Sequence, residues 1–164
     1  MPDLFKRRDP YLSYRFQVEF VGVIRAGFSE VSGLELEIET EEYREGGVND
    51  FIHKLPKGAK YPNIVLKKGI TDTSFLWEWN YAAVYGKMVP MPGRIILINA
   101  KGQETMYWAF MDGYPVKWSG PELKADSNNV ALETLEIAHS GMIRFFTLTY
   151  IADSALSMAK SLIM

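Results

Sequence analysis

The strongest constraint on the fold is the segment from Leu34 to Glu41, in which apolar and acidic residues alternate without a break. Successive side chains of an extended strand point to opposite sides, so the alternation predicts a strand with two unlike faces. One face carries Leu34, Leu36, Ile38 and Thr40, and the other carries Glu35, Glu37, Glu39 and Glu41. A regular row of carboxylates on a strand is typical of a surface that faces water or a water-filled lumen.

Other segments alternate in the same way, or are short apolar runs between turn residues. They are residues 14–21, 51–55, 63–69, 94–99, 105–111, 114–118 and 132–139. Residues 42–50 are expected to form a long hairpin loop, and residues 56–62 a turn. One helix of about 14 residues is expected between Thr71–Thr73, which can cap its first turn, and Gly86. This pattern favours a mainly β fold, a small antiparallel β-barrel or sandwich with one flanking α-helix.

Composition predicts one compact domain. The chain has 164 residues, a net charge of −2 and no cysteine, which excludes disulfides, thiolate metal sites and thiol nucleophiles. The near-neutral charge provides no bulk attraction to nucleic acid or anionic membranes. Basic residues near the N-terminus are not followed by an apolar region, and there is no uninterrupted run of about 18 apolar residues. We expect a soluble protein with a solvated N-terminal arm at residues 1–8.

A search for catalytic and metal-binding patterns finds none. His53 and His139 lie in separate strand-like runs, which is typical of structural or interfacial histidines rather than of metal ligands. Phosphate-loop, dinucleotide-binding and serine-nucleophile signatures are missing from the sequence. The glutamate row does not suggest an acid–base pair, because such a pair needs one carboxyl group in an apolar pocket. The four tryptophans are expected in the core or at an interface. We therefore predict no catalytic residues, no metal and no cofactor.

Charge is segregated between two neighbouring segments. Residues 30–45 contain seven carboxylates and one arginine, a net charge of −6, whereas residues 51–68 contain five lysines and no carboxylate. Surfaces of opposite sign suit a head-to-tail assembly, in which one surface of a copy meets a different surface of the next. The same charges could also neutralise each other within one subunit, and charge alone does not separate the two interpretations.

Six ordered blocks of the sequence resemble the tail-tube proteins of contractile phages and of phage-tail-like contractile injection systems. The blocks are Asp9-Pro10-Tyr11 with Phe16–Glu19, the AGFSEVSGL segment at 26–34, EYREGG at 42–47, KLP at 54–56 with KYPNI at 60–64, PVKWSGP at 115–121 and ETLEIAH at 133–139. Together they span about residues 9–141, and six blocks in order are far more specific than one short motif.

The resemblance implies a structural function without catalysis. Tail-tube proteins form six-membered rings that stack into a hollow tube, and a contractile sheath drives this tube through a target envelope. The implied partners are further copies of the chain, the sheath protein, baseplate or spike and terminator proteins, and the cargo or DNA in the lumen, with no membrane anchor. The implied location is a phage tail or phage-tail-like particle that is assembled in the bacterial cytoplasm and could be released.

The resemblance also implies roles for particular residues. The strand from Leu34 to Glu41 is the candidate lumen-lining strand, with Glu35, Glu37 and Glu39 facing the channel. The segment Glu41, Glu42, Tyr43, Arg44, Glu45, Gly46 and Gly47 resembles the long loop that reaches the adjacent ring. Lys57 and Lys60 are expected near the surface on which that loop lands.

The chain departs from the family pattern after Gly141. We expect three parts: the arm at 1–8, a tail-tube domain at 9–141, and a C-terminal extension at 142–164 that contains a helical stripe of apolar residues in its latter half. The extension suggests an alternative, a specialised tube-initiating or baseplate-proximal homologue. An alternative from a different class is a monomeric ligand-binding β-barrel, which needs a concave and mostly apolar pocket.

Overall fold

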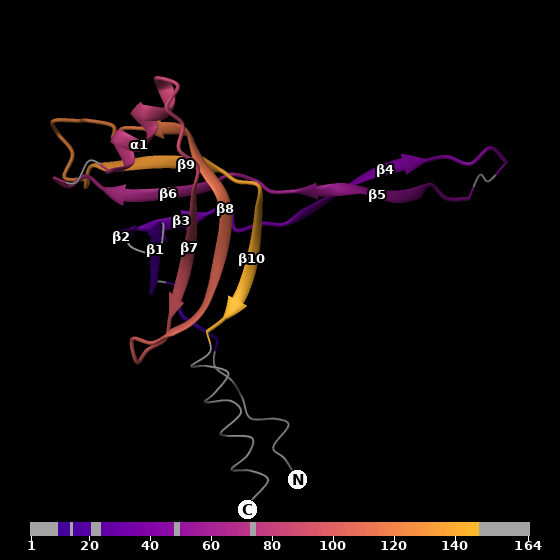
Figure 1. Cartoon of the computed structure of the whole chain (residues 1–164), viewed down its shortest axis with the longest axis horizontal. Helices are drawn as coiled ribbons and strands as arrows, with labels where there is room; N and C mark the ends of the chain where they lie inside the picture. The colour runs from indigo at the N-terminus through magenta and orange to yellow at the C-terminus, as the bar shows by residue number, and fades with distance from the viewer. Residues whose placement is uncertain (1–9, 14, 21–23, 48–49, 73–74, 148–164) are drawn as a thin grey trace, which may run out of the picture.

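The molecule consists of a β body and a long two-stranded arm (Figure 1). The computed structural model describes residues 10–13, 15–20, 24–47, 50–72 and 75–147. The arm consists of β4 (Glu37–Tyr43) and β5 (His53–Lys60), and the helix α1 spans Phe75–Val84. The strands of the body are β1 (Phe16–Phe20), β2 (Ile24–Ala26), β3 (Glu30–Ser32), β6 (Ile64–Gly69), β7 (Met91–Ile98), β8 (Glu104–Ser119), β9 (Leu132–Ala138) and β10 (Gly141–Phe146).

A single antiparallel sheet forms the body and folds over on itself. Its strand order is β2-β1-β7-β8-β9-β6-β3, and β10 pairs with β8 beside this path. Strand β8 joins the two halves, because residues 104–113 pair with β7 and residues 114–119 pair with β9. Asp112, with a φ of 51°, lies where β8 passes from one half to the other. The two strands expected at 105–111 and 114–118 are therefore one bent strand, with the expected irregularity beside Pro115.

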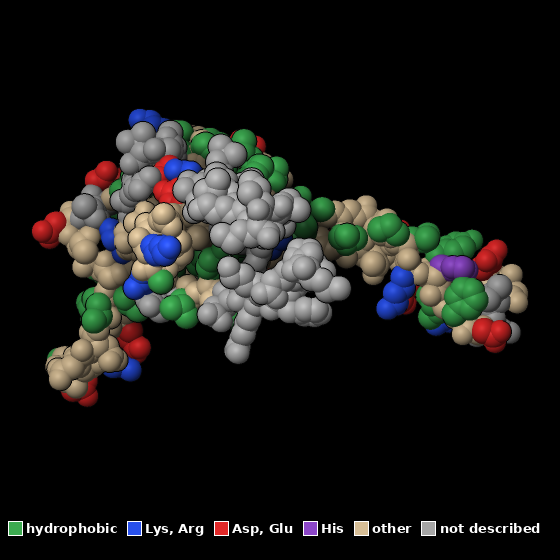
Figure 2. Space-filling view, turned by 90° about the horizontal axis from the view of Figure 1, so that it is seen from below, with side chains coloured by type: hydrophobic (Ala, Val, Ile, Leu, Met, Phe, Trp, Pro, Cys, Tyr) green, Lys and Arg blue, Asp and Glu red, His purple; other side chains and the backbone are tan. Residues whose placement is uncertain are grey.

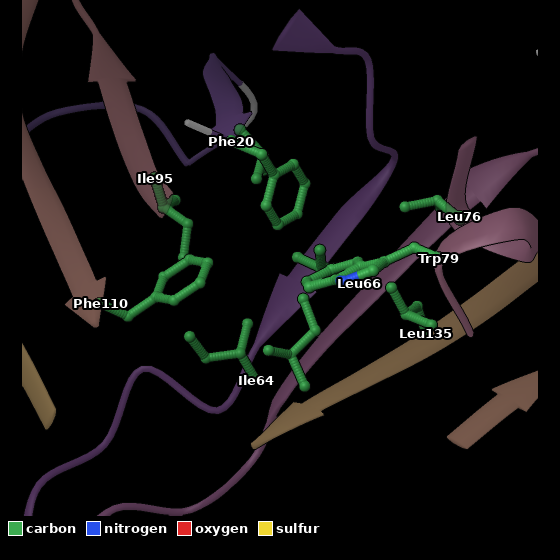
Figure 3. Close-up of a cluster of buried hydrophobic side chains, with 10 residues drawn as sticks. Phe20, Ile64, Leu66, Leu76, Trp79, Ile95, Phe110 and Leu135 are labelled. Carbon is green, nitrogen blue, oxygen red and sulfur yellow. The ribbon is translucent and has the colours of Figure 1, made fainter. Parts of the chain in front are cut away.

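The core lies between the two halves of the folded sheet. Phe20 of β1 contacts Trp79 of α1 edge to face, with ring centroids 5.4 Å apart, and lies 6.1 Å from Phe110 of β8. Figure 3 shows these side chains meeting Ile64 and Leu66 from the opposite half. The remaining buried members of this cluster are Val18, Leu76, Ile95, Leu135 and Ile137. The expected fold class, antiparallel and mainly β with one flanking helix, is confirmed.

The described part of the helix, Phe75–Val84, is shorter than expected but ends where expected, and the possible capping residue Thr73 lies outside the described residues. Gly86, with a φ of 77°, follows the last turn. Its N–H donates to the carbonyl of Ala83, and the N–H of Lys87 donates to that of Ala82. This pattern satisfies carbonyls that a helix end otherwise leaves free, and the positive φ favours glycine.

Two local expectations around the arm are wrong. The strand expected from Leu34 begins at Glu37 and continues to Tyr43. Residues 56–62 do not form a turn up to Lys60, because β5 runs through Pro56 and Gly58. A register irregularity between Glu39 and Thr40 lets β5 accommodate Pro56, whose missing N–H is tolerated in a two-stranded sheet that has free edges.

The ends of the chain were expected to form separate parts. The arm expected at residues 1–8 and the apolar stripe of the latter half of the extension lie outside the described residues. Residues 142–146 belong to β10, which pairs with Met106–Phe110 of β8. The boundary proposed between residues 141 and 142 thus falls at the start of a strand of the sheet.

Gly33 is expected to tolerate no side chain. It has a φ of 83°, and a Cβ atom added there would overlap the backbone carbonyl oxygen of Asn63. Left-handed backbone costs a residue with a Cβ about 1–2 kcal/mol. Displacing the packed backbone of Asn63 would add roughly 1–3 kcal/mol. We expect Gly33→Ala to lower the free energy of unfolding by about the sum of these two costs, as measured by urea denaturation with tryptophan fluorescence.

Gly102→Ala is the matched control for this prediction. Gly102 has a similar φ of 80°, but nothing lies within 4 Å of the position of its added Cβ. Only the conformational term should appear there, so Gly102→Ala should be clearly milder at the same protein concentration. Equal losses in the two variants would show that the contact with Asn63 is unimportant.

Candidate assembly interface

The arm formed by β4 and β5 projects far from the body (Figure 1), and every residue of β4 is exposed. Its two strands pair with each other in a separate two-stranded sheet, so both outer edges of the arm carry backbone groups that are free to pair. Isolated two-stranded hairpins are at best marginally stable in water. An arm of this length is therefore suited to contact with another molecule.

The base of the arm has one acidic and one apolar face. Glu37 lies opposite Lys60 and Glu39 lies opposite Gly58, and residues directly opposite each other share a face. The other face carries Ile38, Thr40, Ala59 and Pro56. Ile38 is 61% exposed, which leaves a branched apolar side chain without cover in a single subunit. The alternation seen in the sequence is thus real, but its apolar side is divided: Leu34 packs against the core of the subunit, whereas Leu36 and Ile38 are exposed.

The tip of the arm combines aromatic and charged residues. His53 contacts the ring of Phe51 edge to face, with centroids 4.7 Å apart, and its Nε2 lies 3.6 Å from a carboxylate oxygen of Glu45. Tyr43 lies opposite His53. Figure 2 shows the far end of the arm, where apolar and acidic side chains surround a histidine. Gly47 turns the chain here with a φ of 105°.

The acidic and basic segments lie side by side within one subunit. In β3 and β6, Lys67 Nζ donates to both carboxylate oxygens of Glu30 at 2.9 Å. In the arm, Glu42 lies opposite Lys54, just as Glu37 lies opposite Lys60. Neutralisation inside the subunit, one of the two interpretations of the charge pattern, therefore accounts for at least part of the segregation.

The structure brings almost all of the expected site residues together in the arm. Glu35 precedes β4 and is exposed, whereas Glu37 and Glu39 lie on β4. The expected inter-ring segment includes the last three residues of β4 and the exposed tip, namely Glu41, Glu42, Tyr43, Arg44, Glu45, Gly46 and Gly47. Lys57 and Lys60 lie on β5 of the same arm, so within one subunit they belong to the projecting element rather than to a separate surface.

A buried ion pair, which the sequence did not reveal, holds β1 to β7. Arg94 Nε and Nη2 donate to the two carboxylate oxygens of Glu19 at 3.0 and 3.2 Å. Glu19 is 1% exposed and Arg94 is 33% exposed. Hydrogen bonding to Glu19 raises the pKa of Arg94. No sequence signal links these two residues, because their strands meet only through register.

The outer side of α1 carries a row of aromatic side chains that was not predicted from the sequence. Trp77 contacts Trp118 of β8 edge to face with centroids 4.7 Å apart, and Tyr81 and Tyr85 continue the row. A hydrogen bond with Tyr85 raises the pKa of Tyr81. The four-residue spacing of Trp77, Tyr81 and Tyr85 was visible in the sequence, but Trp79 between them belongs to the core.

Strand β10 carries exposed apolar side chains that were not predicted from the sequence. Ile143, Phe145 and Phe146 of this strand are exposed. Nε2 of His139, in the connection between β9 and β10, lies 3.1 Å from the carbonyl oxygen of Pro62, and its ring lies beside that of Tyr61, so His139 fixes local structure.

Several solved structures share the fold of this chain. One chain of the six-fold symmetrised anti-feeding prophage (AFP) baseplate is 26% identical, with a TM-score of 0.78 over 85% of this chain and 97% of that chain. One chain of the sheath–tube complex of the extracellular contractile injection system PVC in its extended state is 28% identical, with a TM-score of 0.76 over 84% and 93%. Hcp1 from Flavobacterium johnsoniae shares the fold at 18% identity, with a TM-score of 0.57 over 82% and 100%.

A sequence-family model gives a more particular assignment. The model described as T4-like virus tail tube protein gp19 matches residues 12–143. The chain therefore belongs to the T4-like virus tail tube protein family, as its sequence blocks indicated. No curated protein matches it significantly. Among the described residues, no helix has the length and apolar character needed to cross a membrane.

Proposed function

We propose that the chain is a structural subunit of the inner tube of a contractile phage tail or of a phage-tail-like injection system. Six copies form a ring, the rings stack into a hollow conduit, and a surrounding contractile sheath drives this conduit through a target envelope. The subunit acts by assembly, so the role requires no catalysis and no cofactor. Assembly takes place in the bacterial cytoplasm, before any release of the particle.

The exposed arm is the observation that carries this proposal. It exposes an apolar face, an acidic face and two unpaired strand edges, and a lone hairpin of this kind gains little stability in water. Contact with neighbouring copies would cover the apolar face and pair the edges. Membership of a tail-tube family makes further copies of the same chain the expected neighbours.

The partners follow from the assemblies that contain similar chains. Those assemblies are a sheath–tube complex, a baseplate, a sheath/tube terminator and a tube-terminating cap. By analogy, we assign this chain the sheath protein, baseplate or spike proteins and a terminator as partners, with cargo or DNA in the lumen.

Within the tube, the acidic face of the arm lines the channel and the tip contacts the adjacent ring. Glu35, Glu37 and Glu39 would then keep phosphates and acidic cargo from adhering, because like charges repel. Residues 41–47 reach the next ring, and Lys57 and Lys60 of β5 remain candidates for ring-stacking contacts. The arm geometry supports these assignments, since it places the acidic face and the tip on one projecting element.

A second candidate is a specialised copy at the beginning of the tube or near the baseplate. It is favoured by the similarity to a chain of the AFP baseplate and by the continuation of this chain beyond residue 143, where the family match ends. The division into an arm at 1–8, a tail-tube domain at 9–141 and an extension at 142–164 belongs to the same proposal. A ligand-binding barrel is disfavoured, because core side chains fill the space between the two halves of the sheet.

Negative-stain electron microscopy of the purified full-length protein tests the proposed function. Six-fold rings, or tubes of stacked rings, are the expected result. A protein that remains monomeric at high concentration would overturn the proposal and would favour a binding role instead.

The lumen assignment is tested by a tube map at side-chain resolution. We expect the carboxylates of Glu37 and Glu39 at the channel wall. A variant with Glu35→Lys, Glu37→Lys and Glu39→Lys, assembled with single-stranded DNA, should protect severalfold more DNA from nuclease than the unmodified tube does, because the reversed charge attracts phosphates. The matching glutamine variant should protect little DNA. A map with Glu37 buried against the sheath or in the subunit core would contradict the assignment.

A further inference from the structure

The connection between β8 and β9 forms a hollow that is lined by both polar and apolar residues. Residues 120–132 surround a volume of about 550 Å³. Leu123 is 82% exposed and Val130 is 75% exposed, and Pro121 and Leu132 complete the apolar part of the lining. Exposed apolar side chains such as Leu123 and Val130, which line the same hollow, are suited to a protein contact.

Local hydrogen bonds order this loop. The N–H of Ser127 donates to the carbonyl of Lys124, and the N–H of Asn129 donates to the hydroxyl oxygen of Ser127. The N–H of Ile70 donates to the carbonyl of Ala131, which ties the loop to the end of β6. An ordered hollow binds more tightly than a mobile one, because less conformational freedom is lost on contact.

The hollow and the arm tip lie at opposite ends of the molecule. In Figure 1, which has the longest axis horizontal, the arm extends to the right and the connection from β8 to β9 lies at the left. Two different surfaces at opposite ends of one subunit can meet in successive copies without closing a ring, and the result is an open stack.

The two surfaces also match chemically. The arm tip exposes Tyr43 and Phe51, and the hollow exposes Leu123 and Val130. The loop's lysine, Lys124, already pairs with Glu122 at 2.9 Å, so the loop has little free charge to offer an acidic partner. The aromatic and aliphatic side chains would supply the attraction in this contact, and moderate salt should weaken that attraction little.

We infer that the hollow between β8 and β9 receives the arm tip of a second copy of this chain in the adjacent ring. The inference rests on the proposed function and assigns a docking surface to the tip. It places the main landing site at Leu123 and Val130 rather than at Lys57 and Lys60, which lie on the arm itself.

Cysteine pairing between copies tests the inference, since the natural chain contains no cysteine. One full-length variant carries Phe51→Cys, and a second, distinguished by an affinity tag, carries Leu123→Cys. The two are mixed, assembled and treated with a short bismaleimide. A matched mixture replaces the second variant with Lys101→Cys, an exposed position in the turn between β7 and β8, at the lower end of the body in Figure 1.

We expect severalfold more cross-linked heterodimer from the Phe51→Cys and Leu123→Cys mixture than from the control mixture, at both low and moderate salt. Tubes that form with equally weak cross-linking in both mixtures would overturn the inference and leave the proposed function standing. A protein that forms neither rings nor tubes would overturn both. A second variant, Leu123→Asp, should form rings but few tubes, and normal tubes from it would also count against the hollow.

Discussion

Deleting Glu45–Val48 from the arm tip is expected to leave rings intact and to abolish their stacking into tubes. The deletion shortens the connection between β4 and β5 but leaves both strands, and no residue of the core cluster lies in the arm. The subunit should therefore fold normally, and stability changes away from a core are usually within about 0.5 kcal/mol. Electron microscopy and sedimentation of the variant measure the outcome.

Replacing the same four residues with Gly-Ser-Gly-Ser is the matched control. It preserves the length of the tip and removes its side chains, so it separates the reach of the arm from the chemistry of the deleted segment. Tubes from the replacement but not from the deletion would show that reach is decisive. Tubes of normal length from the deletion would refute the role proposed for the tip.

Arg94→Met is expected to destabilise the subunit more than any surface change. The substitution removes the guanidinium that donates two hydrogen bonds to the carboxylate of Glu19, which is 1% exposed. Loss of one partner from a buried ion pair typically costs about 3–5 kcal/mol. Because Arg94 is one-third exposed, the lower end of that range is expected. For a chain of this size, that corresponds to a fall of roughly 10 °C in the thermal midpoint, measurable by calorimetry.

Two further variants test whether the stability loss comes from the buried ion pair or from a general sensitivity of the fold to substitution. The double change Glu19→Leu with Arg94→Met removes both charges and should recover most of the lost stability, since apolar replacement of a buried pair is often neutral. Lys67→Met breaks the exposed pair with Glu30 and should cost at most about 1 kcal/mol. If Arg94→Met were as mild as Lys67→Met, the buried pair would not stabilise the fold. Hydrogen bonding to Glu19 raises the pKa of Arg94, so its guanidinium stays charged at neutral pH. Titration of Arg94 should therefore not change the stability differences between these variants in that range.

Local patterns in the sequence were sufficient to predict the fold class. Period-two alternation predicted β1 and β9, a short apolar run next to a turn predicted β6, and the glycine at position 86 predicted the end of the helix. These features depend on residues that are close in the chain, and so they can be recognised without tertiary contacts. The family blocks then predicted the tail-tube class, which the family match and the fold support.

Other features depend on contacts between distant segments. The continuation of β5 through Pro56 requires a register irregularity opposite Glu39 and Thr40, and the bend of β8 requires two different partner strands. Strand β3 has only three residues, which is too few for a periodic signal. The pairing of Glu19 with Arg94 joins strands that are far apart in sequence.

The alternating segment at 34–41 shows most clearly which features follow from the local sequence and which follow from the tertiary structure. The sequence by itself determined that this segment is extended and has one acidic and one apolar side, because side-chain direction in a strand follows from backbone geometry alone. Only the tertiary structure decided that β4 leaves the body as an arm, so that its apolar side is uncovered. Whether an apolar face is buried depends on which element lies opposite it, and that is a property of the whole fold.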